Sequence, residues 1–250
     1  MNSGQLSLFS AATPSRAERE DDFIVRESAR ARRMSIKVYP RGRVEVVAPR
    51  RTRARDVEAF VRDNRAWIAR TRAEFAARYP TVDPSPPTEI SLPAIGAVRS
   101  VIYREKDGAT VRCRDLGERL VLTGRVGDEQ RTVAALRRWL AGIARRRLGH
   151  QLEQLSAITG LGYQRLQIRA QRTCWGSHSG RGTISLNYCL LFLQPELVRY
   201  LLIHELCHAR HMNHSRRYWQ LVSRFEPDYR RLDRELGQAW IHVPAWLGVY

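Results

Sequence analysis

The chain has 250 residues, a length that suits one compact domain with extensions or two small domains. Its hydrophobic content of 43% is enough for a core, and 43 Lys and Arg residues against 25 Asp and Glu residues leave a formal net charge of +18. Such a charge attracts polyanions, nucleic acid before an anionic membrane, unless the arginine excess only reflects genome composition.

Cysteine usage and hydropathy exclude several classes of protein. The four cysteines contain no CxxC pair, which argues against both a disulfide framework and a thiolate zinc site. The first twenty residues lack the basic and apolar regions of a signal peptide. No apolar run approaches the roughly 20 residues that span a bilayer. We therefore expect a cytoplasmic protein without a membrane segment.

Residues 1–20 mix Ser, Ala, Pro and charge, which predicts a disordered tail. The tail contains the pentapeptide Gln5-Leu6-Ser7-Leu8-Phe9. This pentapeptide resembles the motif with which many bacterial repair and replication proteins bind the DNA sliding clamp. Two other interpretations stay open, a chance match or a short apolar patch that packs on the adjoining domain.

The region 21–80 is expected to form an N-terminal β-hairpin plus helices. Residues alternate over 34–38 and 44–47, which predicts two paired strands. Over 52–79 the apolar residues recur with helical spacing. Four prolines between Pro80 and Pro87 then mark a linker or domain edge.

The remaining chain divides into a β-rich segment, 81–128, and a mainly helical region, 129–250. Residues 129–155 predict either one long helix or two broken ones, and 166–170 and 183–186 alternate as strands. From Pro195 onward the pattern is helical. Strands and helices that come in blocks favour an α+β fold.

One stretch in this helical region carries a metal-binding pattern, His204-Glu205-Leu206-Cys207-His208. A helix that begins at Pro195 places His204 and His208 one turn apart on one face, where both imidazoles can reach one Zn²⁺. Glu205 is rotated off that face and can reach a water on the metal. HExxH also occurs by chance, but the apolar residues 197–203 predict a buried helix, in which an unsatisfied His-Glu-His cluster would be costly.

Two histidines compete as the third ligand. His211 shares the helical face but lies about 10.5 Å along the axis from His204, at 1.5 Å per residue. Asn213 can end the helix and Ser215 can cap the next one. A bend there would fold His214 back toward the metal, so we favour His214.

Residues 204–208, followed by Asn213-His214-Ser215 and Tyr218-Trp219, resemble the YgjP-like branch of the SprT-type zinc metallopeptidases. A second block upstream is similar, with Trp175-Gly176-Ser177 followed by residues 184–187. The resemblance implies a zincin-like catalytic region, a zinc metalloendopeptidase of the HExxH type. It also implies His204, His208 and His214 as zinc ligands and Glu205 as the catalytic residue.

These roles imply a mechanism in which Glu205 is the general base that takes a proton from a zinc-activated water. The substrate is then a protein or peptide. The resemblance implies that residues 183–186 form the edge strand along which the substrate pairs. Tyr200, Tyr218 and His178 are candidate oxyanion stabilisers, although a packing or surface role is the simpler expectation for each. His178 replaces a cysteine that is usual in the family.

A second function remains open, a DNA- or clamp-associated binding module with a structural zinc site. Structural zinc sites usually have four protein ligands, and a fourth would have to come from His211 or His178. Glu205 in register with the histidines favours the peptidase. The positive net charge and the pentapeptide at residues 5–9 together favour a peptidase that acts on DNA-associated proteins. Its expected partners are then DNA and the sliding clamp.

Overall fold

The structure is a computed structural model that describes residues 23–29, 31–39, 42, 44–78, 85–171 and 174–248. Contacts within the chain divide it into two compact units, Met1–Glu74 and Phe75–Tyr250. The pentapeptide at residues 5–9 lies outside the described residues. Among the described residues, no helix is both long enough and apolar enough to cross a membrane.

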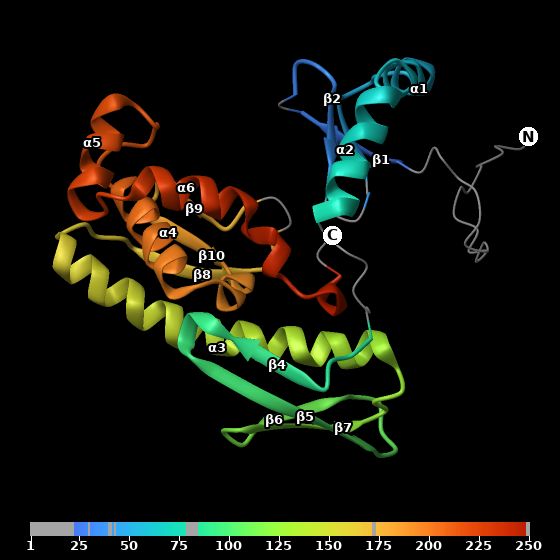
Figure 1. The fold of residues 1–250 in the computed structure, drawn as a ribbon, viewed down its shortest axis with the longest axis vertical. Coiled ribbons are helices and arrows are strands. Elements are labelled where there is room, and N and C mark those ends of the chain that lie inside the picture. Colours follow the sequence, from blue (N-terminus) through green and yellow to red (C-terminus); the bar gives the residue numbers. More distant parts are fainter. Residues whose placement is uncertain are drawn as a thin grey trace, which may run out of the picture. The chain divides into compact units, whose positions relative to one another are not determined.

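The first unit contains a three-stranded sheet of order β1-β3-β2 (Figure 1). Its strands are β1 (Phe23–Ser28), β2 (Ser35–Val38) and β3 (Val44–Pro49). β2 pairs with β3 in antiparallel fashion, whereas β1 pairs with β3 in parallel. The sequence did not predict β1, because most of its residues are exposed and no apolar alternation marks it.

Two helices follow this sheet, where the sequence predicts helix over residues 52–79. α1 (Ala54–Asp63) and α2 (Arg65–Arg78) are separated at Asn64, whose side-chain amide donates to the carbonyl of Phe60 at 2.7 Å. An asparagine that bonds to the backbone in this way competes with helix continuation. Val57 and Val61, one turn apart on α1, pack with Ile68 and the inner residues of β3 in a small core.

The second unit begins with a four-stranded sheet of order β4-β5-β7-β6. Its strands are β4 (Glu89–Leu92), β5 (Ala97–Glu105), β6 (Arg112–Asp115) and β7 (Arg119–Gly124). β5 and β7 are parallel, and the two outer pairs are antiparallel. Alternate residues of β4 and β7 are buried, so one face of this sheet enters the core.

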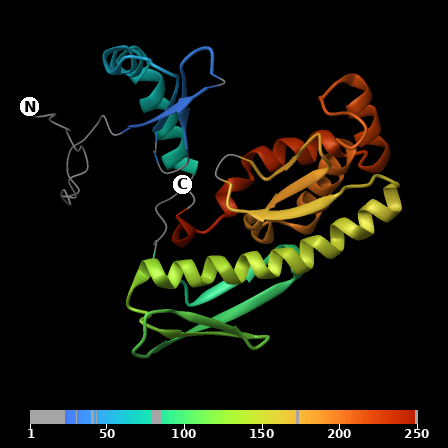
Figure 2. The same cartoon turned by 180° about the vertical axis from the view of Figure 1, so that it is seen from behind.

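A single helix, α3 (Glu129–Thr159), follows and decides between the two alternatives left by the sequence. It begins at Asp128, whose side chain accepts from the Arg131 amide, and it ends at Gly160 in the left-handed conformation. Gly149 does not break the helix, because it packs against Leu166 of the next sheet. Within the second unit, α3 lies between the four-stranded sheet and the elements that follow it in the chain (Figures 1 and 2). These elements share one hydrophobic core.

The second three-stranded sheet has the order β8-β10-β9. β8 (Arg165–Arg169) is parallel to β10 (Thr183–Asn187), and β9 (Gly176–His178) is antiparallel to it. The expectation that residues 183–186 form the edge strand is therefore wrong, because both edges of β10 are already paired. The outer strand that contacts the helix at Pro195–Cys207 is β9.

After β10 the described part of the second unit is helical, and it ends with two short 3₁₀ segments, Ala239–His242 and Ala245–Leu247. A short 3₁₀ segment (Tyr188–Phe192) leads into α4 (Pro195–Cys207), which is followed by α5 (Arg216–Phe225) and α6 (Tyr229–Gln238). α4 packs against α3, α5, α6 and β9. It therefore lies at the centre of this part of the fold, as its nearly continuous apolar sequence requires.

Candidate metal centre

α4 begins where the sequence predicts, with Gln194 as N-cap and Pro195 in the first turn. Nine of its residues are buried, including Glu205. On its exposed side, Glu196 forms an ion pair with Arg231 of α6 at 3.2 Å. The helix thus carries His204 and Glu205 into the protein on a segment held on several sides.

The turn after α4 brings His214 toward the helix. α4 ends at Cys207, and the Nδ1 atom of His208 lies 3.0 Å from the carbonyl of His211. Ser215 caps α5, and its hydroxyl accepts from the amide of Tyr218. The chain therefore bends from His208 onward, five residues earlier than the predicted end at Asn213.

The candidate ligand atoms of His204, His208 and His214 all lie within 4.8 Å of one another. The Nε2 atoms of His204 and His214 are 3.2 Å apart. Two ligands at about 2.0–2.1 Å from a tetrahedral Zn²⁺ are separated by about 3.3 Å, so this spacing fits the ion. His211 is not a member of this cluster, and its backbone carbonyl instead fixes the ring of His208.

Two polar contacts orient the histidine rings. Asp233 accepts the hydroxyl of Tyr200 at 2.7 Å, and that hydroxyl lies 3.5 Å from Nδ1 of His204. Nδ1 of His208 faces the His211 carbonyl, which can only accept, so this nitrogen carries the proton. Nε2 of His208 is then left as a ligand atom, which is the usual arrangement around metal-binding histidines.

Burial favours the neutral form of the His204 and His208 imidazoles. Burial, with contributions from His208 and His214, lowers the pKa of His204 to about 3. Burial also lowers the pKa of His208, against the opposing effect of its hydrogen bond to His211. Metal ions bind neutral imidazole, so the site does not need to release protons from these two rings near neutral pH.

Glu205 is 3% exposed, and its Oε2 atom has no hydrogen-bond partner among the described residues. Burial raises the pKa of this carboxyl to about 8. A buried polar atom without a partner is costly, and it is expected where a ligand or water completes the site. The histidine spacing thus fits a metal ion, and the residue that follows His204 carries a buried carboxyl atom without a partner.

Gly176 of β9 makes room for the Glu205 side chain. A Cβ atom at this position would lie 2.7 Å from Oε1 of Glu205 and 3.1 Å from its Cδ. Only glycine allows the strand to approach the carboxylate this closely. The sequence pointed to Gly176 through the family resemblance alone, without a role for it.

The raised pKa of Glu205 predicts how the stability of the metal-free protein depends on pH. An unfolded chain releases this proton near the ordinary glutamate pKa of 4.5, whereas the folded protein holds it up to about pH 8. The stability that this carboxyl contributes is therefore lost as pH rises. His204 has the opposite effect only below its ordinary pKa of 6.5, so the net fall in stability is expected between about pH 6.5 and 8.

In this window the free energy of unfolding should decrease by about 1.4 kcal/mol per pH unit, the equivalent of one proton. Urea unfolding in the presence of a chelator measures it. The Glu205→Gln variant is the control, because it has no carboxyl to ionise and should show little slope. An equal slope in both proteins would contradict the effect of burial on Glu205.

The three candidate oxyanion stabilisers all use their protons within the chain. Tyr200 donates to Asp233, and Tyr218 donates to the His204 carbonyl at 3.1 Å. Nδ1 of His178 lies 2.5 Å from the Glu205 carbonyl. His178 is thus a partly buried residue packed against the metal-binding helix, which corrects the expectation of a surface histidine.

Several residues that build the site lay outside the sequence predictions. Asp233 orients His204 through Tyr200, from a helix nearly thirty residues further along the chain. Trp175 donates to the carbonyl of Leu236 at 3.0 Å and thereby ties the start of β9 to α6. No local pattern identifies Asp233, because it looks like any other exposed acid on an amphipathic helix.

The buried thiol of Cys207 is not part of the centre. Its pKa is raised to about 12 by burial, and the side chain is fully enclosed. It behaves as the small hydrophobic residue that its place on the flank of the helix indicates.

The chain matches the family model described as YgjP-like, metallopeptidase domain, over residues 32–239. Among solved structures, it is similar to the crystal structure of the metallopeptidase zymogen of Pyrococcus abyssi abylysin, with 28% sequence identity and a TM-score of 0.33. That similarity covers 36% of this chain and 93% of the other. No curated protein matches the sequence.

Proposed function

Because this chain belongs to the YgjP-like metallopeptidase family, we propose that it is a zinc-dependent endopeptidase with Glu205 as the general base. The observation that carries the proposal is the buried, unpartnered Oε2 atom of Glu205, the residue that follows the first of three clustered histidines. A purely structural zinc site does not require a buried, unpartnered carboxyl group, which costs folding free energy.

His204, His208 and His214 would hold the metal through imidazole nitrogens. When bound, zinc acts as a Lewis acid that polarises the substrate carbonyl and lowers the pKa of a water. Asp233, through Tyr200, and the His211 carbonyl keep the first two rings in place. The stacking of Tyr218 on His208, with ring centroids 4.7 Å apart, adds a rigid wall.

Glu205 would move the proton in hydrolysis. As the water oxygen bonds to the scissile carbonyl carbon, Glu205 accepts the water proton. It then donates that proton to the departing nitrogen, and the C–N bond breaks. In the metal-free protein burial raises the pKa of this carboxyl, and a bound cation would lower it toward the range in which the carboxylate accepts a proton.

We further propose that the substrate pairs with β9 rather than with β10. β9 is one of the two outer strands of its sheet, and it contacts α4. An extended peptide that adds to this edge would bond to backbone groups beside Gly176 and His178, next to Glu205. Backbone pairing of this kind tolerates many side chains.

The alternative, a binding module with a structural zinc site, has less support. Only three residues form the metal-binding cluster among the described residues. His211 or His178 would have to supply the fourth ligand, but neither belongs to the cluster. A structural zinc site would normally be closed by a fourth protein ligand.

We also propose that the protein associates with DNA or with the sliding clamp. The net charge of +18 supports it, as do the exposed arginines 145–147 on α3. Arg137 and Arg138 are less available, because they donate to the carbonyls of Leu247 and Val111. Binding through phosphate contacts of this kind weakens steeply with salt.

Metal removal and restoration test the proposed function. The protein should cleave unfolded casein, lose that activity when a chelator removes the metal, and regain it with one equivalent of Zn²⁺ but not with Mg²⁺, which prefers oxygen ligands. Metal content is measured in parallel by mass spectrometry. Unchanged cleavage by a preparation with no measurable metal would show that the hydrolysis does not depend on this centre.

A further inference from the structure

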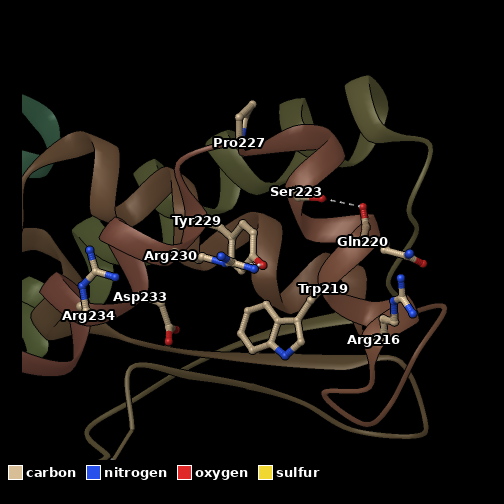
Figure 3. A pocket seen from close by; sticks show the side chains of 9 residues that line it. All are labelled: Arg216, Trp219, Gln220, Ser223, Pro227, Tyr229, Arg230, Asp233 and Arg234. Atoms are coloured by element: carbon tan, nitrogen blue, oxygen red, sulfur yellow. Dashed lines mark hydrogen bonds between the residues drawn. The ribbon is translucent and has the colours of Figure 1, made fainter.

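A cavity of about 810 Å³ lies between α5 and α6, close to the metal centre (Figure 3). Three arginines line it: Arg216 at the start of α5, and Arg230 and Arg234 on α6. Asp233 is the only acidic residue in its lining. We name this cavity the arginine pocket.

The positive charge of the arginine pocket is not neutralised within the described part of the chain. None of its three guanidinium groups forms an ion pair there. Arg230 only donates to the hydroxyl of Tyr229 and lies over that ring at 5.7 Å. Asp233 already accepts the hydroxyl of Tyr200. The pocket therefore presents uncompensated donors that suit an anion.

The pocket shares a wall with the metal centre. Trp219 stacks on His214 at 5.6 Å between ring centroids and on Tyr229 at 5.2 Å. Its indole thus has a candidate ligand on one side and a pocket residue on the other. Asp233 makes a second connection, because it holds the Tyr200 hydroxyl that lies beside His204. A group bound in the pocket would therefore lie next to the site of hydrolysis.

We propose that the arginine pocket binds an acidic side chain of the polypeptide substrate, a Glu or an Asp close to the scissile bond. In calling the occupant a substrate, the inference rests on the proposed peptidase function. A carboxylate matches the planar guanidinium groups, and Trp219 and Tyr229 supply an apolar surface for the methylene groups of the side chain.

A peptide fits these observations better than a nucleic acid does. The pocket carries one carboxylate, Asp233, which would repel the closely spaced phosphates of a strand but which a single peptide carboxylate can avoid. It also adjoins the histidine cluster rather than the arginines 145–147 of α3. The shared Trp219 wall would place the occupant beside the metal, where a peptide bond is required.

Peptide binding to the zinc-loaded Glu205→Gln protein tests the inference without cleavage. Two nonapeptides with a neutral dye, identical except for a central Glu or Gln, are compared by fluorescence anisotropy. The Glu peptide should bind about tenfold more tightly, the lower end for a charge-assisted hydrogen bond in an open site. Adding Arg234→Ala or Arg216→Ala to this protein should remove most of the preference.

The matched control is Arg231→Ala, which removes the same charge from the neighbouring position of α6. Arg231 does not line the pocket and pairs with Glu196 and Glu235. It should leave the preference for Glu intact. The three replaced residues, Arg216, Arg231 and Arg234, are exposed, so their replacement should not disturb folding. Loss of the preference in the control as well would show a diffuse charge effect and contradict the pocket.

Further outcomes separate this inference from the proposed function. Equal or undetectable binding of both peptides would overturn the pocket even if the wild-type protein cleaves casein. A preference for Glu that depends on Arg234 would support the pocket even if no cleavage is found, and the peptidase proposal alone would fail. If Arg234→Ala weakens binding of a fifteen-residue oligothymidylate but spares the Glu preference, the pocket is a nucleic-acid site and the inference is wrong.

Discussion

The His204→Ala and His208→Ala variants are each expected to lose the bound metal and, with it, all detectable peptide hydrolysis. Each substitution removes one of three imidazoles from the cluster, and two ligands hold zinc far less tightly than three. His214→Ala should weaken the metal as well. Its effect should be smaller, because His214 is exposed and lies on the turn rather than on α4.

His211→Ala is the matched control for these variants. It removes an imidazole from the same turn but keeps the backbone carbonyl that faces His208. Zinc content and activity should therefore stay near those of the wild-type protein. Competition with a chromophoric chelator measures the affinities. If His211→Ala lost the metal while His214→Ala retained it, the assignment of the third ligand would be wrong.

Glu205→Gln should reduce hydrolysis by about 10²–10⁴-fold, the range expected for removal of a general base. Glutamine keeps the shape of the side chain but cannot accept a proton from water. The histidine cluster does not include Glu205, so the variant should retain one zinc per chain. Initial rates of cleavage together with zinc content measure both quantities.

Gly176→Ala offers an independent check on the same carboxylate. The added methyl group would meet Glu205 rather than the histidines, so it should also lower the rate without removing the metal. A fully active Glu205→Gln protein would exclude this residue as the base, whatever the metal content.

Local sequence patterns were sufficient to locate α4, the helix that carries His204 and Glu205. Pro195 at its start and the apolar residues 197–203 predicted a buried helix, and the helical period placed His204 and His208 on one face. These features depend on neighbours within about one turn. The same reasoning suggested that the chain bends before His214, although the structure begins that bend at His208.

The strands were predicted less well. β9 has the sequence Gly-Ser-His, which carries no apolar alternation and therefore no strand signal. β1 is mostly exposed, and β4 follows a proline-rich segment. The sequence left open whether residues 129–155 form one helix or two, and the structure shows one helix in which Gly149 packs closely on Leu166.

By itself, then, the sequence determined a buried helix with two histidines and a glutamate in register, and a basic protein around it. Tertiary contacts set three further features: β10 is the central strand with β9 at one edge, Gly176 makes room for Glu205, and Asp233 orients His204 through Tyr200. The physical reason is that periodicity records which face of a segment is buried, but not what it is buried against. A strand has two edges with equivalent hydrogen-bonding groups, so its neighbours are chosen by residues distant in the chain.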